Sequence, residues 1–206
     1  MKDDDILKNK TDTKTKIFNV ALHLFAAHGY ENVTVREIAV NVGIKAASIY
    51  NHYTDKEKIL HDCYNYYIMY RHITRLNKDE YEPIIKNGTK EEVMNIINYS
   101  YPDSILENMI MCLLIIFSRI YNDKKAMEIY TDDINASMEY LIEFFNTGIE
   151  IGRFYEFNIH TISLMIYSTR LFTAQSVTIK PELKDKWRSA ELDFFNELVR
   201  LIPFKY

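Results

Sequence analysis

The apolar side chains near the start of the sequence recur every three to four positions. Between residues 17 and 25 they are Ile17, Val20, Ala21, Leu24 and Phe25. This spacing places them on one face of an α-helix, which predicts a helix with one buried side. Gly29 follows, and because glycine adopts positive φ angles without a steric penalty we expect the helix to end there.

The next positions combine a helix start with a helix stop. Thr34-Val35-Arg36-Glu37 has the pattern of a capping box, in which the Thr hydroxyl and the Glu carboxylate each accept the other residue's backbone N–H. It predicts a second helix, which Gly43 ends after about two turns. A third, short helix is expected from about Lys45 or Ala46 to His52.

The remainder of the chain also follows helical spacing and has few residues that interrupt helices. Only five Gly and four Pro occur in 206 residues, which favours long helices. Thr54 to Glu57 has the pattern of another capping box and predicts a long helix to about Asn77, with Pro83 and Gly88 in the connection that follows. We expect an all-α fold of about nine helices.

This pattern divides the chain into three parts. Residues 1–12 are polar and charged, and we expect a flexible tail. Residues 13–57 form a three-helix N-terminal domain, and residues 58–206 form a larger helical domain.

Composition fits a globular, cytoplasmic protein. Apolar residues make up 48% of the chain and charged residues 26%. Residues 1–16 lack the apolar segment of a signal peptide, and the longest apolar run, Met109 to Phe117, is too short to span a bilayer. Cys63 and Cys112 both lie in apolar helical contexts, which is typical of reduced thiols in the cytosol.

Charge is distributed unevenly along the chain. Between residues 13 and 60, Lys and Arg outnumber Asp and Glu by six to four, whereas from residue 61 onward the acidic residues lead by twenty-one to sixteen. A mildly basic N-terminal domain on an acidic remainder fits a local DNA-binding surface.

The patterns of enzymes and metal sites are not found in the sequence. Its six His and two Cys show no metal-ligand spacing such as HExxH or CxxC, and it has no glycine-rich phosphate loop. We therefore expect no catalytic residues, no metal site, no cofactor and no enzyme activity.

Residues 38–49 meet the packing requirements of a helix-turn-helix. Two short helices that cross steeply need a small residue at their contact, a glycine at the turn and apolar anchors to the core. Ala39 supplies the small residue and Gly43 the turn, while the anchors are Ile38, Ile44 and Ile49. The other face of the second helix is polar, with Lys45, Ser48, Asn51 and His52.

The stretch from Ile17 to Leu60 closely resembles the tetracycline-repressor (TetR) family of transcriptional regulators. The resemblance rests on Val33-Thr34-Val35-Arg36-Glu37-Ile38-Ala39, on Gly43-Ile44 and on the run from Ser48 to Glu57. Gly148 to Phe154 also resembles the family's junction before its last two helices. The resemblance implies a repressor that binds double-stranded DNA as a homodimer, with a pocket for a small-molecule effector in the larger domain.

The same resemblance assigns roles within the helix-turn-helix. The positions that usually contact DNA phosphates are Thr34, Tyr50, His52 and Lys56, and the groove-facing stretch of the recognition helix is Lys45, Ala46, Ala47, Ser48 and Asn51. Family members often carry Lys-Gly after the turn, whereas this chain has Ala46-Ala47 and places its lysine at position 45. We therefore expect base readout by Lys45, Ser48 and Asn51, with an alanine methyl against thymine.

The last two helices are the expected dimer interface. The first of them is apolar around most of its circumference, and the second carries two apolar stripes, one for the core and one for a partner. The predicted interface residues are Leu164, Leu171, Phe194, Leu198 and Leu201. The alternative is that all of these side chains form the core of one monomer.

Aromatic and methionine side chains are abundant in the larger domain. The chain contains 16 Tyr, 11 Phe and 8 Met, which can line an apolar pocket with a few hydroxyl groups. The predicted lining residues are Tyr67, Tyr70, Met109, Phe117, Tyr121, Phe144, Phe145 and Tyr167. For any single residue a place in the core is the commoner outcome. The predicted effector is a small apolar or aromatic molecule.

Two other functions are compatible with these patterns. One is an effector-independent DNA-binding protein whose larger domain is filled, and the other is a protein-interaction adaptor that keeps the helix-turn-helix as a scaffold. Selective binding to a palindromic duplex would exclude the adaptor. A cavity on the order of several hundred Å³ would favour an effector.

Overall fold

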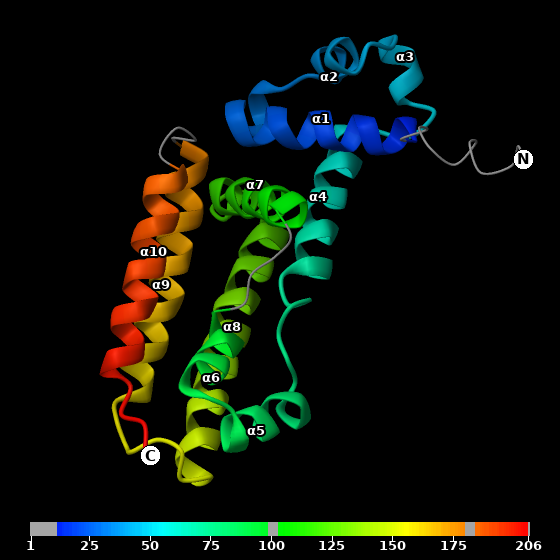
Figure 1. Ribbon diagram of the computed structural model, residues 1–206. Coiled ribbons are helices and arrows are strands. Elements are labelled where there is room, and N and C mark those ends of the chain that lie inside the picture. The colour runs from blue at the N-terminus through cyan, green and yellow to red at the C-terminus, as the bar shows by residue number, and fades with distance from the viewer. Residues whose placement is uncertain (1–11, 99–102, 180–183, 206) are drawn as a thin grey trace, which may run out of the picture. The chain divides into compact units, whose positions relative to one another are not determined.

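A computed structural model describes residues 12–98, 103–179 and 184–205 of the chain (Figure 1). Within these residues every regular element is helical, which confirms the predicted all-α fold. The elements are α1 (Thr13–His28), the 3-10 turn η1 (Tyr30–Asn32), α2 (Val35–Val42), α3 (Ala46–Ile49), α4 (Lys56–Tyr70), α5 (Lys78–Asn87), α6 (Lys90–Ile97), α7 (Asp103–Arg119), α8 (Lys124–Glu150), α9 (Ile159–Ile179) and α10 (Lys184–Leu201). The predicted tail lies outside the described residues, except for Asp12.

The described residues contain ten α-helices, one more than predicted, and the additional helix is α5. The long helix expected to reach Asn77 ends at Tyr70 instead. Asn77 starts α5 through a complete capping box with Glu80, with bonds of 3.1 Å and 2.8 Å. Pro83 lies inside this helix although it cannot donate a backbone hydrogen bond. The cap and the buried side chains of Tyr81 and Ile85 stabilise α5 despite that loss.

The chain forms two compact units. One consists of Met1–Met69 and Met111–Met127, and the other of Tyr70–Ile110 and Glu128–Tyr206. None of the described helices has the length and apolar character needed to cross a bilayer.

The first unit contains the three N-terminal helices, and α2 and α3 lie together on one side of α1 (Figure 1). The buried face of α1 consists of Ile17, Ala21, Leu22 and Phe25. Gly29 ends the helix with φ +80°, as predicted. Ile38 and Ala39 of α2 and Ile49 of α3 are each at most 1% exposed and lie in the core, whereas Ile44, the third predicted anchor, is half-buried.

Aromatic side chains form the core of the second unit. Phe144 and Phe145 on α8 are fully buried, with ring centroids 5.2 Å apart. Phe154, which follows α8, packs edge-on against Phe204 at 4.8 Å. In the same unit α9 and α10 lie side by side (Figure 1), and Phe195 of α10 contributes to this core.

Helix α8 is capped by the residue that precedes it. It starts at Lys124. Asp123 supplies the cap, because its Oδ1 accepts the backbone N–H groups of Lys125 at 2.9 Å and Ala126 at 3.2 Å. An aspartate at this position satisfies N–H groups that have no partner within the helix.

Candidate nucleic-acid interface

The start of α2 is a capped and exposed helix N-terminus. Thr34 has extended backbone angles, and its Oγ1 accepts the backbone N–H of Glu37 at 3.2 Å. The structure thus shows one of the two bonds of the predicted capping box. The Thr34 side chain is exposed. Helix N-termini present N–H groups and a partial positive charge to anions, so Thr34 lies where an anion would be favoured.

The turn between α2 and α3 depends on Gly43. This residue has φ +80° and ψ 30°, a left-handed conformation that side chains with a Cβ rarely adopt. Its N–H donates to the carbonyl of Val40 at 3.1 Å, and the N–H of Ile44 donates to Ala39 at 3.0 Å. These bonds end α2 and direct the chain into α3, as the sequence predicts.

Helix α3 is shorter than predicted, because it ends at Ile49 rather than at His52. The next residues form a turn in which the N–H groups of His52 and Tyr53 both donate to the Ile49 carbonyl, at 2.9 and 3.0 Å. Ile49 is only 1% exposed and therefore anchors this segment to the core.

The predicted groove-facing residues lie within a few positions of this anchor in the sequence and differ in exposure. Lys45, Ala47 and Asn51 are exposed, whereas Ala46 and Ser48 are half-buried. Among the predicted phosphate contacts, Tyr50 is 58% exposed and His52 is also exposed. Most of the predicted recognition residues are therefore accessible to solvent.

Helix α4 begins with a different cap from the one predicted. Asp55, not Thr54, accepts the backbone N–H of Lys58, at 2.7 Å, and Thr54 Oγ1 donates to the other carboxylate oxygen of Asp55 at 3.0 Å. The bond from Lys58, followed by that from Thr54, lowers the pKa of Asp55. A carboxylate is a stronger acceptor than a hydroxyl, which explains why the aspartate takes the cap position.

The ammonium group of Lys56 is bound to the backbone that precedes α2. Its Nζ donates to the carbonyl oxygens of Tyr30 and Val33, both at 2.8 Å, and lies 4.1 Å from the centroid of the Tyr30 ring. An ammonium has three donors, so these two bonds leave one. Lys56 therefore supports the segment leading to Thr34, a role that the sequence pattern did not indicate.

Two further residues belong to this surface or support it. Arg36 is exposed in the first turn of α2, two positions after Thr34, and the capping box could have identified it as a neighbour of the phosphate site. Arg119 contacts Glu31 in η1, at 2.6 Å between Nη1 and Oε1. No local pattern indicates a contact across 88 positions of sequence.

The predicted pocket residues occupy different environments. Phe117 is 41% exposed and Tyr121 is 86% exposed, so these two side chains do not line an enclosed pocket. Phe144 and Phe145 are fully buried in the aromatic core, and Met109 and Tyr67 are also buried. The hydroxyl of Tyr167 donates to Asp133 at 3.4 Å, and Tyr70 is half-buried.

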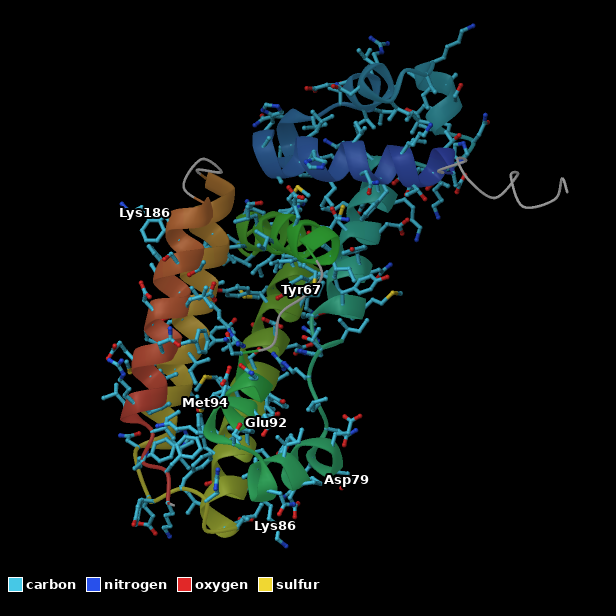
Figure 2. All side chains as sticks on the ribbon, viewed as in Figure 1. Tyr67, Asp79, Lys86, Glu92, Met94 and Lys186 are labelled. Carbon is cyan, nitrogen blue, oxygen red and sulfur yellow. The ribbon has the colours of Figure 1, made fainter. Side chains whose placement is uncertain are left out.

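A cavity of about 410 Å³ lies elsewhere, within the second unit. Its lining residues are Thr74, Leu76, Ile84, Glu92, Asn95 and Ile96, none of which was predicted. Three of them are apolar, and the Thr74 hydroxyl is buried without a hydrogen-bond partner. Glu92 on α6 (Figure 2) accepts the Thr89 N–H at 2.7 Å, a bond that lowers its pKa. The lining therefore combines three apolar side chains with one carboxylate, one amide and one unsatisfied hydroxyl.

The predicted dimer residues divide between the surface and the core. Leu164 is 58% exposed and Leu201 is 64% exposed, whereas Leu171 and Phe194 are half-buried. Leu198 was predicted at the interface, but it is 1% exposed and belongs to the core of its own chain. The core stripe of α10 is Phe195, Leu198 and Ile202, so the sequence pattern assigned Leu198 to the wrong stripe.

Comparison with known proteins identifies a matching family and a curated relative. Residues 17–63 match the family described as bacterial regulatory proteins, tetR family. A stretch of 72 residues is 39% identical to IcaR of Staphylococcus epidermidis, the negative transcriptional regulator of the biofilm operon icaADBC. The match covers 33% of this chain and 38% of that protein. The chain thus spans under two fifths of the length of this curated relative.

Solved structures share the fold over nearly the whole chain. The TetR family regulator PfmR from Thermus thermophilus superposes with a TM-score of 0.64 and 18% identity, over 93% of this chain and 97% of that one. The fatty acid degradation regulator FadR from Bacillus halodurans gives a TM-score of 0.58 and 17% identity, over 93% and 97%. At these identities the similarity is one of fold.

Proposed function

We propose that the chain is a transcriptional repressor of the TetR family that binds a palindromic operator as a homodimer and is released by a small-molecule effector. The observation that carries the proposal is the exposed surface formed by α3 and the turn after it. IcaR of S. epidermidis, which is 39% identical to this chain over 72 residues, is a negative transcriptional regulator. Binding to the chromosome requires the protein to act in the cytoplasm.

We assign base recognition to Lys45, Ser48 and Asn51, with the methyl groups of Ala46 and Ala47 available to thymine. A lysine donates to guanine O6 and N7, and an asparagine can bond adenine in a bidentate manner. Exposure of Lys45 and Asn51 supports this assignment. Ser48 is half-buried and would contact DNA through its hydroxyl group.

Phosphate contacts are assigned to Thr34, Tyr50, His52 and Lys56. The first three are exposed, and the third donor of the Lys56 ammonium is available beyond its two carbonyl bonds. Such contacts fix the register of a protein on the duplex without reading sequence. Residues 13–57 are the proposed DNA-binding domain.

Dimerisation is assigned to α9 and α10 of the proposed effector-binding and dimerisation domain, residues 58–206. Large apolar side chains on these helices are exposed in the single chain, among them Leu164, Phe172, Leu192 and Leu201. Exposed apolar groups of this kind mark protein interfaces when they form a continuous patch. Two recognition helices related by a twofold axis would reach successive major grooves about 34–36 Å apart.

The effector is proposed to be a small, mainly apolar molecule. The cavity lined by α5, α6 and the segment before α5 supports this, because its volume of about 410 Å³ falls in the range of ligand pockets. Leu76, Ile84 and Ile96 provide apolar contacts, and the unpartnered Thr74 hydroxyl provides a polar one.

Operator selection with the purified full-length chain tests the proposal. Random duplexes are selected and sequenced, and binding to the winning sequence is measured as a function of salt and against a panel of metabolites and drugs. We expect a palindromic site whose affinity decreases with salt. Selection of no duplex above background would overturn the proposed function.

A matched pair of lysine variants tests the assigned surface. Lys45→Ala should change the preferred bases, whereas Lys86→Ala should leave both preference and affinity unchanged. Lys86 is exposed on α5 (Figure 2) and lies outside the proposed interface. Unaltered preference in Lys45→Ala would remove Lys45 from the recognition surface.

A further inference from the structure

Arg119, in the last turn of α7, contacts three residues of the first unit. Its Nη1 lies 2.6 Å from Glu31 Oε1, its Nε lies 3.4 Å from Asp123 Oδ2, and its guanidinium carbon lies 4.5 Å from the centroid of the Tyr30 ring. The side chain is only 14% exposed. Its bond to Glu31 lowers the pKa of that carboxyl group, so the pair is charged at neutral pH.

Asp123 connects Arg119 to two further helices. One carboxylate oxygen caps α8, and the other accepts the Tyr64 hydroxyl of α4 at 2.8 Å as well as Arg119. Burial alone would raise the pKa of Asp123, but the hydrogen bonds from Tyr64, the α8 backbone and Arg119 outweigh it, and the pKa is lowered. The start of α8, the end of α7 and the middle of α4 thus share one ionised carboxylate.

Tyr30 connects Arg119 to the segment that leads into α2. The ammonium of Lys56 lies over the same ring at 4.1 Å and binds the carbonyls of Tyr30 and Val33. Val33 is 1% exposed and directly precedes Thr34. A continuous series of contacts therefore runs from Asp123 through Arg119, Tyr30 and Lys56 to the residue before the α2 cap.

We propose that Arg119 is a positioning residue for DNA recognition. By holding Glu31 and Tyr30, Arg119 fixes the backbone conformation between η1 and Thr34. This conformation determines how the start of α2 is oriented toward a DNA phosphate. A displacement of the turn between α7 and α8 would reach α2 through the same contacts. The inference rests on the proposed DNA-binding function.

The chemistry of arginine suits this role. A guanidinium is planar, so it bonds carboxylates along its edges while its face packs against an aromatic ring. Lysine keeps the charge but presents a single nitrogen, which cannot make the bonds to Glu31 and Asp123 in the same geometry. Glu31 is 75% exposed, and exposed ion pairs add little stability. The contact is therefore suited to orienting the segment rather than to holding the fold.

Arg119→Lys is the informative variant, because it keeps the charge that DNA would sense. With the operator obtained by selection, we expect its affinity to fall about fivefold, the loss of a modest interaction. The slope of log affinity against log salt should stay unchanged, because no phosphate contact is lost. Lys86→Arg is the control, because it also exchanges one cationic side chain for another but lies exposed on α5, outside the proposed DNA and dimer interfaces; its affinity should equal that of the wild type.

Amide hydrogen exchange provides a readout that a general loss of stability would not reproduce. In Arg119→Lys the amides of Asn32 and Val33, bonded to Gly29 and Tyr30 at 3.3 Å each, should exchange faster. The buried amides of α1 should be unchanged. Faster exchange throughout the unit would indicate loss of stability and overturn the positioning role.

Glu31→Gln tests the same contact from the other side. Arg119 acts partly through Glu31. Glu31→Gln should therefore lower operator affinity less when it is introduced into Arg119→Lys than when it is introduced into the wild type. Equal changes in the two backgrounds, or wild-type affinity in Arg119→Lys, would overturn the inference and leave the proposed function intact. If the wild type bound no duplex, the proposed function would fail, and the positioning role with it.

Discussion

Gly148 lies so close to the ring of Phe154 that a Cβ at position 148 would come within 2.1 Å of Phe154 Cε2. The ring cannot move aside, because Phe154 is fully buried and packs against Phe145 and Phe204. The close approach of the end of α8 to the chain that follows it therefore requires glycine.

Gly148→Ala should destabilise the protein by about 2 kcal/mol, the typical cost of an overpacked core. Alanine favours helices, but by only about 1 kcal/mol. Urea denaturation followed by circular dichroism measures the change. Phe154→Leu makes space at the same site, so Gly148→Ala should lower the free energy of unfolding by less in that background. If the two variants lowered the free energy of unfolding additively, the predicted clash would be contradicted.

Lys56→Gln should lower the free energy of unfolding by about 1–2 kcal/mol, because two carbonyl groups lose a charged donor. Lys58→Gln is the control, since Lys58 is 52% exposed and pairs only loosely with Asp62, at 3.9 Å. Thermal melting of both variants makes the comparison. Equal losses would show that the bonds of Lys56 to Tyr30 and Val33 do not stabilise the fold.

Thr34→Val should destabilise α2 by about 1 kcal/mol, since valine has the shape of threonine but cannot accept the N–H of Glu37. Thr34→Ser retains the hydroxyl and should recover most of this loss. Denaturant titration of the two variants tests the cap. Thr34→Ser should also bind the operator more tightly than Thr34→Val, because the proposed phosphate contact uses the hydroxyl group.

Stability should decrease as the pH falls from about 6.5 toward 4, because His72 resists protonation in the folded chain. Burial, together with the charges of Arg75 and Arg71, lowers its pKa from 6.5 to about 4. Between these values the unfolded chain binds a proton that the folded chain does not, so acid favours unfolding.

His72→Gln should remove this part of the pH dependence. His160→Gln is the control, because His160 is exposed and its loss should leave the curve unchanged. Urea denaturation at intervals from pH 7 to pH 4 provides the curves. An unchanged slope in His72→Gln would show that other groups cause the effect.

Local features of the N-terminal domain were predictable because they depend on neighbours within a few residues. The Thr34 cap bonds Glu37 three positions later, and Gly43 adopts the left-handed conformation that its turn needs. The same local rules missed α5, because a proline such as Pro83, considered without its tertiary contacts, indicates the end of a helix. They also missed the cap of α4, because Thr54 and Asp55 are both acceptable cap residues.

By itself the sequence determined the all-helical class, the helix-turn-helix and the polar surface of its recognition segment, since periodicity and caps are local properties. Only the tertiary structure decided which face is buried where a helix carries two apolar stripes. It placed Leu198 in the core rather than at the interface, because both stripes of α10 are apolar and packing chooses between them. It also joined Lys56 to Val33 and Arg119 to Glu31, pairs separated by 23 and 88 positions. Such contacts depend on how distant helices pack, which no local pattern contains.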